Sequence, residues 1–84
     1  MRPKKAVALR YEQHKDSAPR IVAKGAGEVA QAIIQAAKEG NVPVLKQNAL
    51  VESLISLELD SVIPEELYQV VAEVLSYVYQ ARKW

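Results

Sequence analysis

The chain has 84 residues and a mass of 9.3 kDa, with 50% apolar and 25% charged residues. This length supports one small core, so we expect a single globular domain over residues 1–84. The absence of Cys and the single His exclude disulfides, thiolate nucleophiles and metal sites that need Cys or two His. The apolar runs are shorter than the ~20 residues of a membrane span, and no apolar stretch typical of a signal peptide follows the basic start.

The net charge of +1 conceals an uneven distribution. Residues 1–24 carry seven Lys or Arg against two acidic residues, a balance of +5, and residues 25–84 carry four against eight, a balance of −4. A basic first third can bind nucleic acid, lipid headgroups or an acidic protein surface. The simpler interpretation is a set of solvated positions beside an acidic half.

Residues 5–11 predict a strand, because Val7, Leu9 and Tyr11 alternate with Ala6 and Ala8. Both faces are apolar and one carries small side chains, so we expect a helix close over the alanines. A polar connection, residues 12–18, then leads past a proline to a second extended run over residues 21–23.

Residues 28–39 predict the first helix, with an apolar stripe through Val29, Ile33 and Ala37. Gly40 is expected to end it in the left-handed conformation. Residues 41–45 predict a third strand, parallel to the second in a βαβ unit, and Pro43 places that strand at a sheet edge or makes it the start of one.

A second helix is predicted over residues 49–57, with Asn48 as its N-cap, and a third helix with Pro64 at its first position. The order β-β-α-β-α-α predicts an α/β fold, with a small mixed sheet of about three to four strands packed by three helices.

The sequence offers little catalytic chemistry. No serine lies in a Gly-x-Ser-x-Gly setting, and His14 lies in the polar connection without a positioned partner. The Gly25-Ala-Gly27 stretch before a helix is similar to a phosphate-binding turn, but it lacks the third glycine and the P-loop lysine, so we expect a tight strand-to-helix turn. We predict no catalytic residue, metal or cofactor, and hence no enzyme. The aromatic residues of the last third offer either a partner surface or packing: Tyr68, Tyr77, Tyr79 and Trp84.

Five stretches of the chain resemble one family, in order and with matching gaps. They are Ala6-Val-Ala-Leu-Arg-Tyr11, Ala18-Pro-Arg-Ile-Val-Ala-Lys-Gly-Ala26, Asn41-Val-Pro-Val44, Ile63-Pro-Glu-Glu-Leu-Tyr68 and Val71-Ala-Glu-Val-Leu-Ser-Tyr-Val-Tyr79. This pattern is similar to the C-terminal cytoplasmic domain of the FlhB/YscU proteins, the specificity switches of flagellar and virulence type III export. The resemblance covers nearly the whole chain and implies the fold of that domain.

Members of that family cleave themselves at an Asn-Pro-Thr-His turn just before this segment, where the Asn side-chain nitrogen attacks its own carbonyl carbon. When the chain is aligned on residues 6–9, the motif positions hold Met1, Arg2, Pro3 and Lys4. No Asn-Pro dipeptide occurs, since valine follows Asn41 and alanine follows Asn48. The resemblance therefore predicts a stand-alone relative of the post-cleavage fragment, without autoproteolysis or a membrane anchor.

Two departures from the family bear on the fold. Gly27 stands where many relatives have an acidic helix cap, which predicts a looser helix start. The family's strand before the cleavage turn has no counterpart in residues 1–84, so we expect an unfilled sheet position where a partner adds a strand or two copies pair.

The resemblance implies a non-enzymatic protein-interaction component of type III or flagellar export, cytoplasmic or peripheral at the membrane export apparatus. Its partners would be proteins of that apparatus or export substrates. By position near the family's turn, the partner-binding candidates are Lys4, Lys5, Arg10, Tyr11, Arg20 and Lys24. The alternative is a small nucleic-acid-binding module that uses the same basic patch, in which Tyr11 is the one stacking aromatic.

Overall fold

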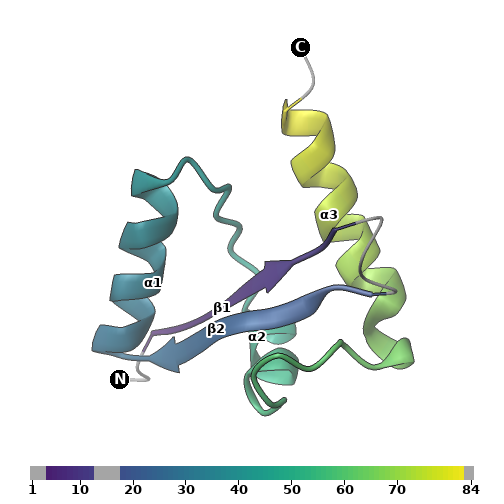
Figure 1. Ribbon diagram of the computed structural model, residues 1–84, viewed down its shortest axis with the longest axis horizontal. Helices are drawn as coiled ribbons and strands as arrows, with labels where there is room; N and C mark the ends of the chain where they lie inside the picture. Colours follow the sequence, from purple (N-terminus) through teal and green to yellow (C-terminus); the bar gives the residue numbers. More distant parts are fainter. Residues whose placement is uncertain (1–3, 13–17, 83–84) are drawn as a thin grey trace.

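The computed structural model describes residues 4–12 and 18–82, with the side chains of the last helix described through residue 76. Two strands precede three α-helices, and a 3-10 turn leads into the last: β1 (Lys5–Arg10), β2 (Arg20–Ala26), α1 (Glu28–Glu39), α2 (Asn48–Ile55), η1 (Glu65–Leu67) and α3 (Tyr68–Arg82). Figure 1 shows α1 and α3 at opposite ends of the two strands, with α2 between them. The predicted α/β class and the three helices are confirmed.

The two strands pair antiparallel, with Ala6 opposite Gly25 and Ala8 opposite Ala23. Leu9 then pairs with Ile21, so Val22 is an extra residue that makes a bulge in β2. On its other edge β2 meets residues 60–63, whose chain runs antiparallel to it: the amide of Ile21 donates to the Ser61 carbonyl at 3.1 Å. Among the described residues β2 is therefore central and β1 lies at the edge.

One face of the sheet carries small residues and is covered by α1, as the alternation in β1 predicts. Ala30 of this helix is completely buried. A Cβ atom on Gly25 would lie 2.1 Å from Cγ1 of Val29, far inside van der Waals contact. The missing side chain at Gly25 therefore lets α1 start directly above the strand that precedes it.

The opposite face of the sheet looks onto the apolar core, which α2 and α3 complete. Its buried residues form one cluster: Ala18, Leu50, Leu54, Ile63 and Val71. Val7 and Leu9 of β1 pack against this cluster and are half-buried. Burial of such side chains contributes about 1.5–3 kcal/mol each, so this cluster is the main source of stability.

The turn between β2 and α1 is a single residue, as expected for a tight strand-to-helix connection. Gly27 has φ 61° and ψ −125°, a conformation that residues with a Cβ rarely adopt. Its amide donates to the Lys4 carbonyl at 2.7 Å, and no side chain caps the helix start. Gly27 supplies no acidic side-chain cap, but its backbone bond to the neighbouring strand holds the start of α1 in place.

The expected strand over residues 41–45 is wrong, and with it the parallel βαβ unit. Residues 42–47 are irregular, and the sheet has two antiparallel strands plus one isolated bridge between Arg20 and Val62. The amide of Val42 already donates to the Ala37 carbonyl at 2.8 Å, and Pro43 has no amide hydrogen. The start of this segment therefore has no donors for a strand ladder.

The end of α1 also differs from the expectation. Gly40 has φ −89°, and the left-handed residue is Asn41, with φ 58°. The Asn41 and Val42 amides donate to the Lys38 and Ala37 carbonyls, the pattern of a Schellman motif. Asn tolerates this conformation because its short polar side chain bonds locally.

The starts of the other two helices are shifted by one residue or more. Asn48 lies in the first turn of α2, which Gln47 precedes without a side-chain cap, and α2 ends at Ile55. Pro64 has φ −70° and ψ 157°, so it is extended and lies outside the helix that it precedes. The fixed φ of proline is compatible with both a helical and an extended conformation, so the sequence alone did not show which of the two Pro64 adopts.

Candidate functional site

A pocket of about 300 Å³ lies between the end of β1, the start of β2 and the first turns of α3. Its lining residues come from four parts of the chain: Tyr11, Ala18, Pro19, Ile63, Tyr68, Val71, Ala72, Leu75 and Ser76. Within this lining no residue is charged, and the polar side-chain groups are three hydroxyls. Such a pocket fits an uncharged, mainly apolar group.

The floor of the pocket is part of the core, and its rim is open to solvent. Ile63 and Val71 are each 1% exposed and Ala18 is 2% exposed, whereas Tyr68 is 42% exposed. Along α3 the lining residues recur at three- and four-residue steps, which places them on one helix face. The small side chains of Ala18 and Ala72 leave the hollow that larger residues would fill.

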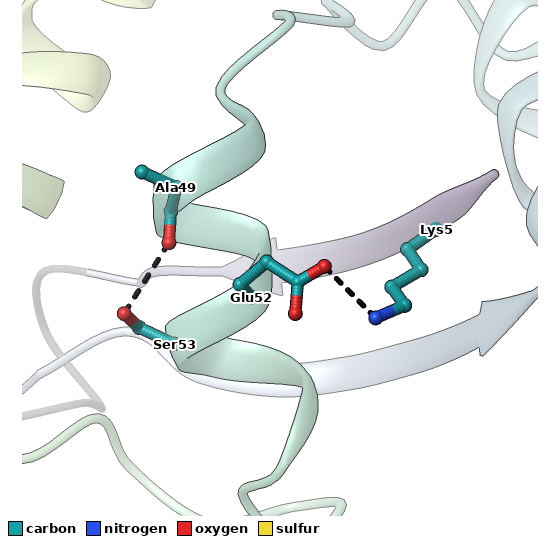
Figure 2. Close-up of polar contacts among 4 residues, drawn as sticks. All are labelled: Lys5, Ala49, Glu52 and Ser53. Atoms are coloured by element: carbon teal, nitrogen blue, oxygen red, sulfur yellow. Dashed lines mark hydrogen bonds and ion pairs between the residues drawn. The ribbon is translucent and has the colours of Figure 1, made fainter. Parts of the chain in front are cut away.

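Among the six predicted partner-binding residues, Tyr11 lines this pocket. Lys5 lies at the other end of β1, where its Nζ contacts Oε1 of Glu52 at 2.8 Å (Figure 2). Six residues of strand separate the two ends by roughly 17–20 Å. Tyr11 and Lys5 therefore belong to different surfaces.

The strand register places Arg10 opposite Arg20, and each makes contacts within the chain. Nε of Arg10 lies 3.8 Å from Oε1 of Glu12, a weak exposed pair. Nη1 of Arg20 donates to the Asp60 carbonyl at 2.7 Å. The guanidinium of Arg20 thus helps to hold residues 60–63 against β2.

Lys24 also has an internal role. Its Nζ donates to the Ile55 carbonyl at 2.9 Å and to the Leu57 carbonyl, and these bonds are half-buried. An ammonium at a helix C-terminus satisfies carbonyls that lack helical partners. The internal contacts of Lys5, Arg20 and Lys24 weaken the nucleic-acid interpretation, because such binding needs cations that reach phosphates. Lys4 and Arg10 remain exposed.

Seven pocket residues were not predicted from the sequence as site residues: Ala18, Pro19, Ile63, Val71, Ala72, Leu75 and Ser76. Ala18 and Pro19, which precede β2, lie 52 or more positions from Val71 and the pocket residues that follow it in α3, and nothing local in the sequence marks either group. His14 lies outside the described residues, as do the side chains of Tyr77, Tyr79 and Trp84.

In the part of the chain that the structure describes, no three His, Cys, Asp or Glu side chains gather as metal ligands would. None of the helices found there combines the length and apolar character that crossing a membrane requires. The pocket beside α3 is a hollow among the described residues that fits an apolar group.

Two solved structures share this fold, a C-terminal domain and a cytoplasmic domain. The cytoplasmic domain of FlhB from Shewanella putrefaciens matches with a TM-score of 0.91 and 38% identity, over 94% of this chain and 62% of that one. The PscU C-terminal domain matches with a TM-score of 0.84 and 29% identity, over 88% and 95% of the two chains. The architecture is therefore that of an FlhB/YscU-type cytoplasmic domain.

The sequence comparisons agree with this class. The model of the FlhB HrpN YscU SpaS family matches residues 3–78, so the chain belongs to that family. The chain is 48% identical to the protein YlqH of Bacillus subtilis (strain 168) over 77 residues, which is 92% of this chain and 83% of YlqH. It is 46% identical over 80 residues to the flagellar biosynthetic protein FlhB of Escherichia coli (strain K12), of which it spans 21%, or about one fifth.

Proposed function

We propose that this chain is a non-enzymatic protein-interaction component of type III or flagellar export, and that its pocket docks an apolar segment of an export substrate or of an apparatus protein. Family membership supports the export role. The observation that carries the docking role is the uncharged pocket of about 300 Å³ beside α3.

The pocket suits a short anchor rather than an extended interface. Its buried floor, with Ile63 and Val71 each 1% exposed, is already held in place by the core. Inserting one large apolar side chain is worth about 1.5–3 kcal/mol before the cost of association. Binding through this pocket alone is therefore weak and rapidly reversible, as suits a protein that handles passing substrates.

The chemistry of the chain supports a role without catalysis. The family's cleavage reaction needs an Asn followed by Pro, and here Val42 follows Asn41 and Ala49 follows Asn48. The side chains around the pocket offer no base within a hydrogen-bonded pair. The proposed action is thus recognition by shape and apolar contact.

The test uses two alanines that are both exposed on helices, Ala72 at the pocket and Ala36 on α1. The chain is supplied to cells whose full-length FlhB lacks its C-terminal fragment, and the amount of secreted flagellar protein is measured. We expect the unmodified chain and Ala36→Glu to restore export, and Ala72→Glu to fail because it places a carboxylate in an apolar pocket. Thermal unfolding by circular dichroism confirms that both variants fold.

Two results would contradict the proposal at different levels. If the unmodified chain restores no export and captures no purified export substrate, the export role is wrong. If Ala72→Glu restores export as well as Ala36→Glu does, the export role stands and the docking site lies elsewhere.

A further inference from the structure

The outer edge of β1 is the side that faces away from β2. On its inner side β1 pairs with β2. The start of β2 is also bonded on its other side, because the Asp60 amide donates to the Ile21 carbonyl at 2.7 Å and, just before the strand, the Ile63 amide donates to the Pro19 carbonyl at 3.0 Å. Within the described residues no strand pairs with the outer edge of β1. In Figure 1 no other arrow runs along the side of β1 that faces away from β2.

The register shows which backbone groups this edge presents. The Lys4 carbonyl accepts a bond from Gly27, so Lys4, and with it Ala6 and Ala8, directs its peptide groups toward β2. Because these directions alternate along a strand, the N–H and C=O groups of Lys5, Val7 and Leu9 point outward. The edge therefore offers three residues with free pairing directions.

The burial of β1 is consistent with a missing neighbour. Val7 and Leu9 pack against the core cluster, yet both are half-buried. Ile21, which is opposite Leu9 on the central strand, is 0% exposed. A strand added beside β1 would cover the open flank of Val7 and Leu9, as β2 already covers the other.

We propose that the outer edge of β1 binds an extended segment of another protein that is apolar at its centre and acidic at both ends. Exposed Lys4 and Arg10 flank the edge, so acidic ends complement it. In the register centred on Val7, two copies of this chain would place Lys4 of each opposite Arg10 of the other, whereas a segment with acidic ends places opposite charges at both positions. This mode of binding is β-augmentation, and it is independent of the pocket beside α3.

The probe for the test is a capped synthetic peptide, Glu-Val-Thr-Val-Thr-Val-Glu, whose length matches residues 4–10. Paired antiparallel, its glutamates lie opposite Lys4 and Arg10, and its valines lie on the face of Val7. Amide hydrogen exchange of the full chain is followed by NMR with and without saturating peptide. We expect exchange at Lys5, Val7 and Leu9 to slow by roughly tenfold or more, and exchange at Ala6 and Ala8, which already face β2, to change little.

Three controls separate edge binding from other modes. Methylating the backbone nitrogens of either the valines or the threonines should abolish binding for one set and spare the other, since alternate amides point to opposite sides. Replacing the glutamates by lysines, or Arg10→Glu in the chain, should weaken binding by roughly fivefold. The Ala72→Glu variant should bind the peptide as tightly as the unmodified chain does.

Several outcomes would overturn the proposal. Absence of binding, equal effects of the two methylation patterns, or loss of binding in Ala72→Glu would each show that the peptide does not add to the edge. A dimer seen by light scattering without peptide, with the same amides protected, would show that the occupant is a second copy.

Discussion

Nζ of Lys24, in the middle of β2, lies 2.9 Å from the carbonyl oxygen of Ile55, the last residue of α2. The same ammonium donates to the Leu57 carbonyl, two residues further on. It thereby replaces the helical donors that the end of α2 lacks, and it joins the helix to the sheet. Lys24, which the sequence alone suggests is a surface cation, thus stabilises the packing of α2 on β2 through a residue 31 positions away.

Replacing this cation should cost stability. Lys24→Met keeps the length of the side chain and removes both hydrogen bonds, so we expect the free energy of unfolding to fall by about 1–3 kcal/mol. Urea denaturation followed by circular dichroism measures the change. Lys4→Met removes an exposed lysine from the same region and should change stability by less than about 0.5 kcal/mol. Equal effects of the two substitutions would show that the Lys24 bonds add nothing.

The close approach of α1 to β2 makes a second prediction. In Gly25→Ala the new Cβ would lie 2.1 Å from Cγ1 and 2.7 Å from Cβ of Val29, so the helix must shift. We expect a loss of about 1–3 kcal/mol. Val29→Gly removes both atoms, so the double variant should be more stable than the sum of the single effects predicts. Strict additivity in thermal unfolding would argue against this contact.

Two glycines flank α1, and their backbone conformations predict opposite effects of an alanine substitution on stability. Gly27 has φ 61° with nothing within 4 Å of a Cβ, so Gly27→Ala meets conformational strain alone, worth about 1–3 kcal/mol. Gly40 has φ −89°, and its Cβ would meet the nearest atom at 3.4 Å, so Gly40→Ala should be neutral or stabilising by about 0.4–1 kcal/mol. Chemical denaturation of the two variants side by side checks the contrast, which an equal loss would refute.

The ion pair between Lys5 and Glu52 joins β1 to α2 at a solvent-exposed position. Its side chains are 32% and 51% exposed, so we expect a coupling energy of only about 0.2–1 kcal/mol. A double-mutant cycle with Lys5→Met and Glu52→Gln measures it. Near 1 M salt, where the Debye length is about 3 Å, the coupling should shrink further. A coupling that is larger, or that salt does not change, would indicate a less solvated pair.

The partner-binding residues were only partly foreseeable. Lys5, Arg20 and Lys24 are cations that sequence alone could assign equally well to a partner or to the fold, and the structure gives each an internal contact. Tyr11 lines a pocket, but the pocket exists only because the fold brings Ala18 and Ala72 to the same hollow. Small residues leave a hollow only when larger neighbours surround it, and that arrangement has no local sequence signature.

The elements themselves were largely readable from the chain. The period of side chains predicted β1 and also α1 with its observed bounds of residues 28–39, because alternation and helical periodicity record which face each element buries. The apolar run over residues 21–23 predicted only part of the second strand, which runs from Arg20 to Ala26. The family membership was likewise carried by residues in order along the chain.

What the chain alone did not determine was the pairing of its segments. Residues 41–45 have the composition of a strand, yet they form none, whereas residues 60–63 pair with β2 without resembling a strand in sequence. A strand exists only where a neighbour supplies donors and acceptors, and neighbours are set by how the helices pack on the sheet. The open edge of β1 and the pocket beside α3 follow from that packing, and for this reason only the tertiary structure revealed them.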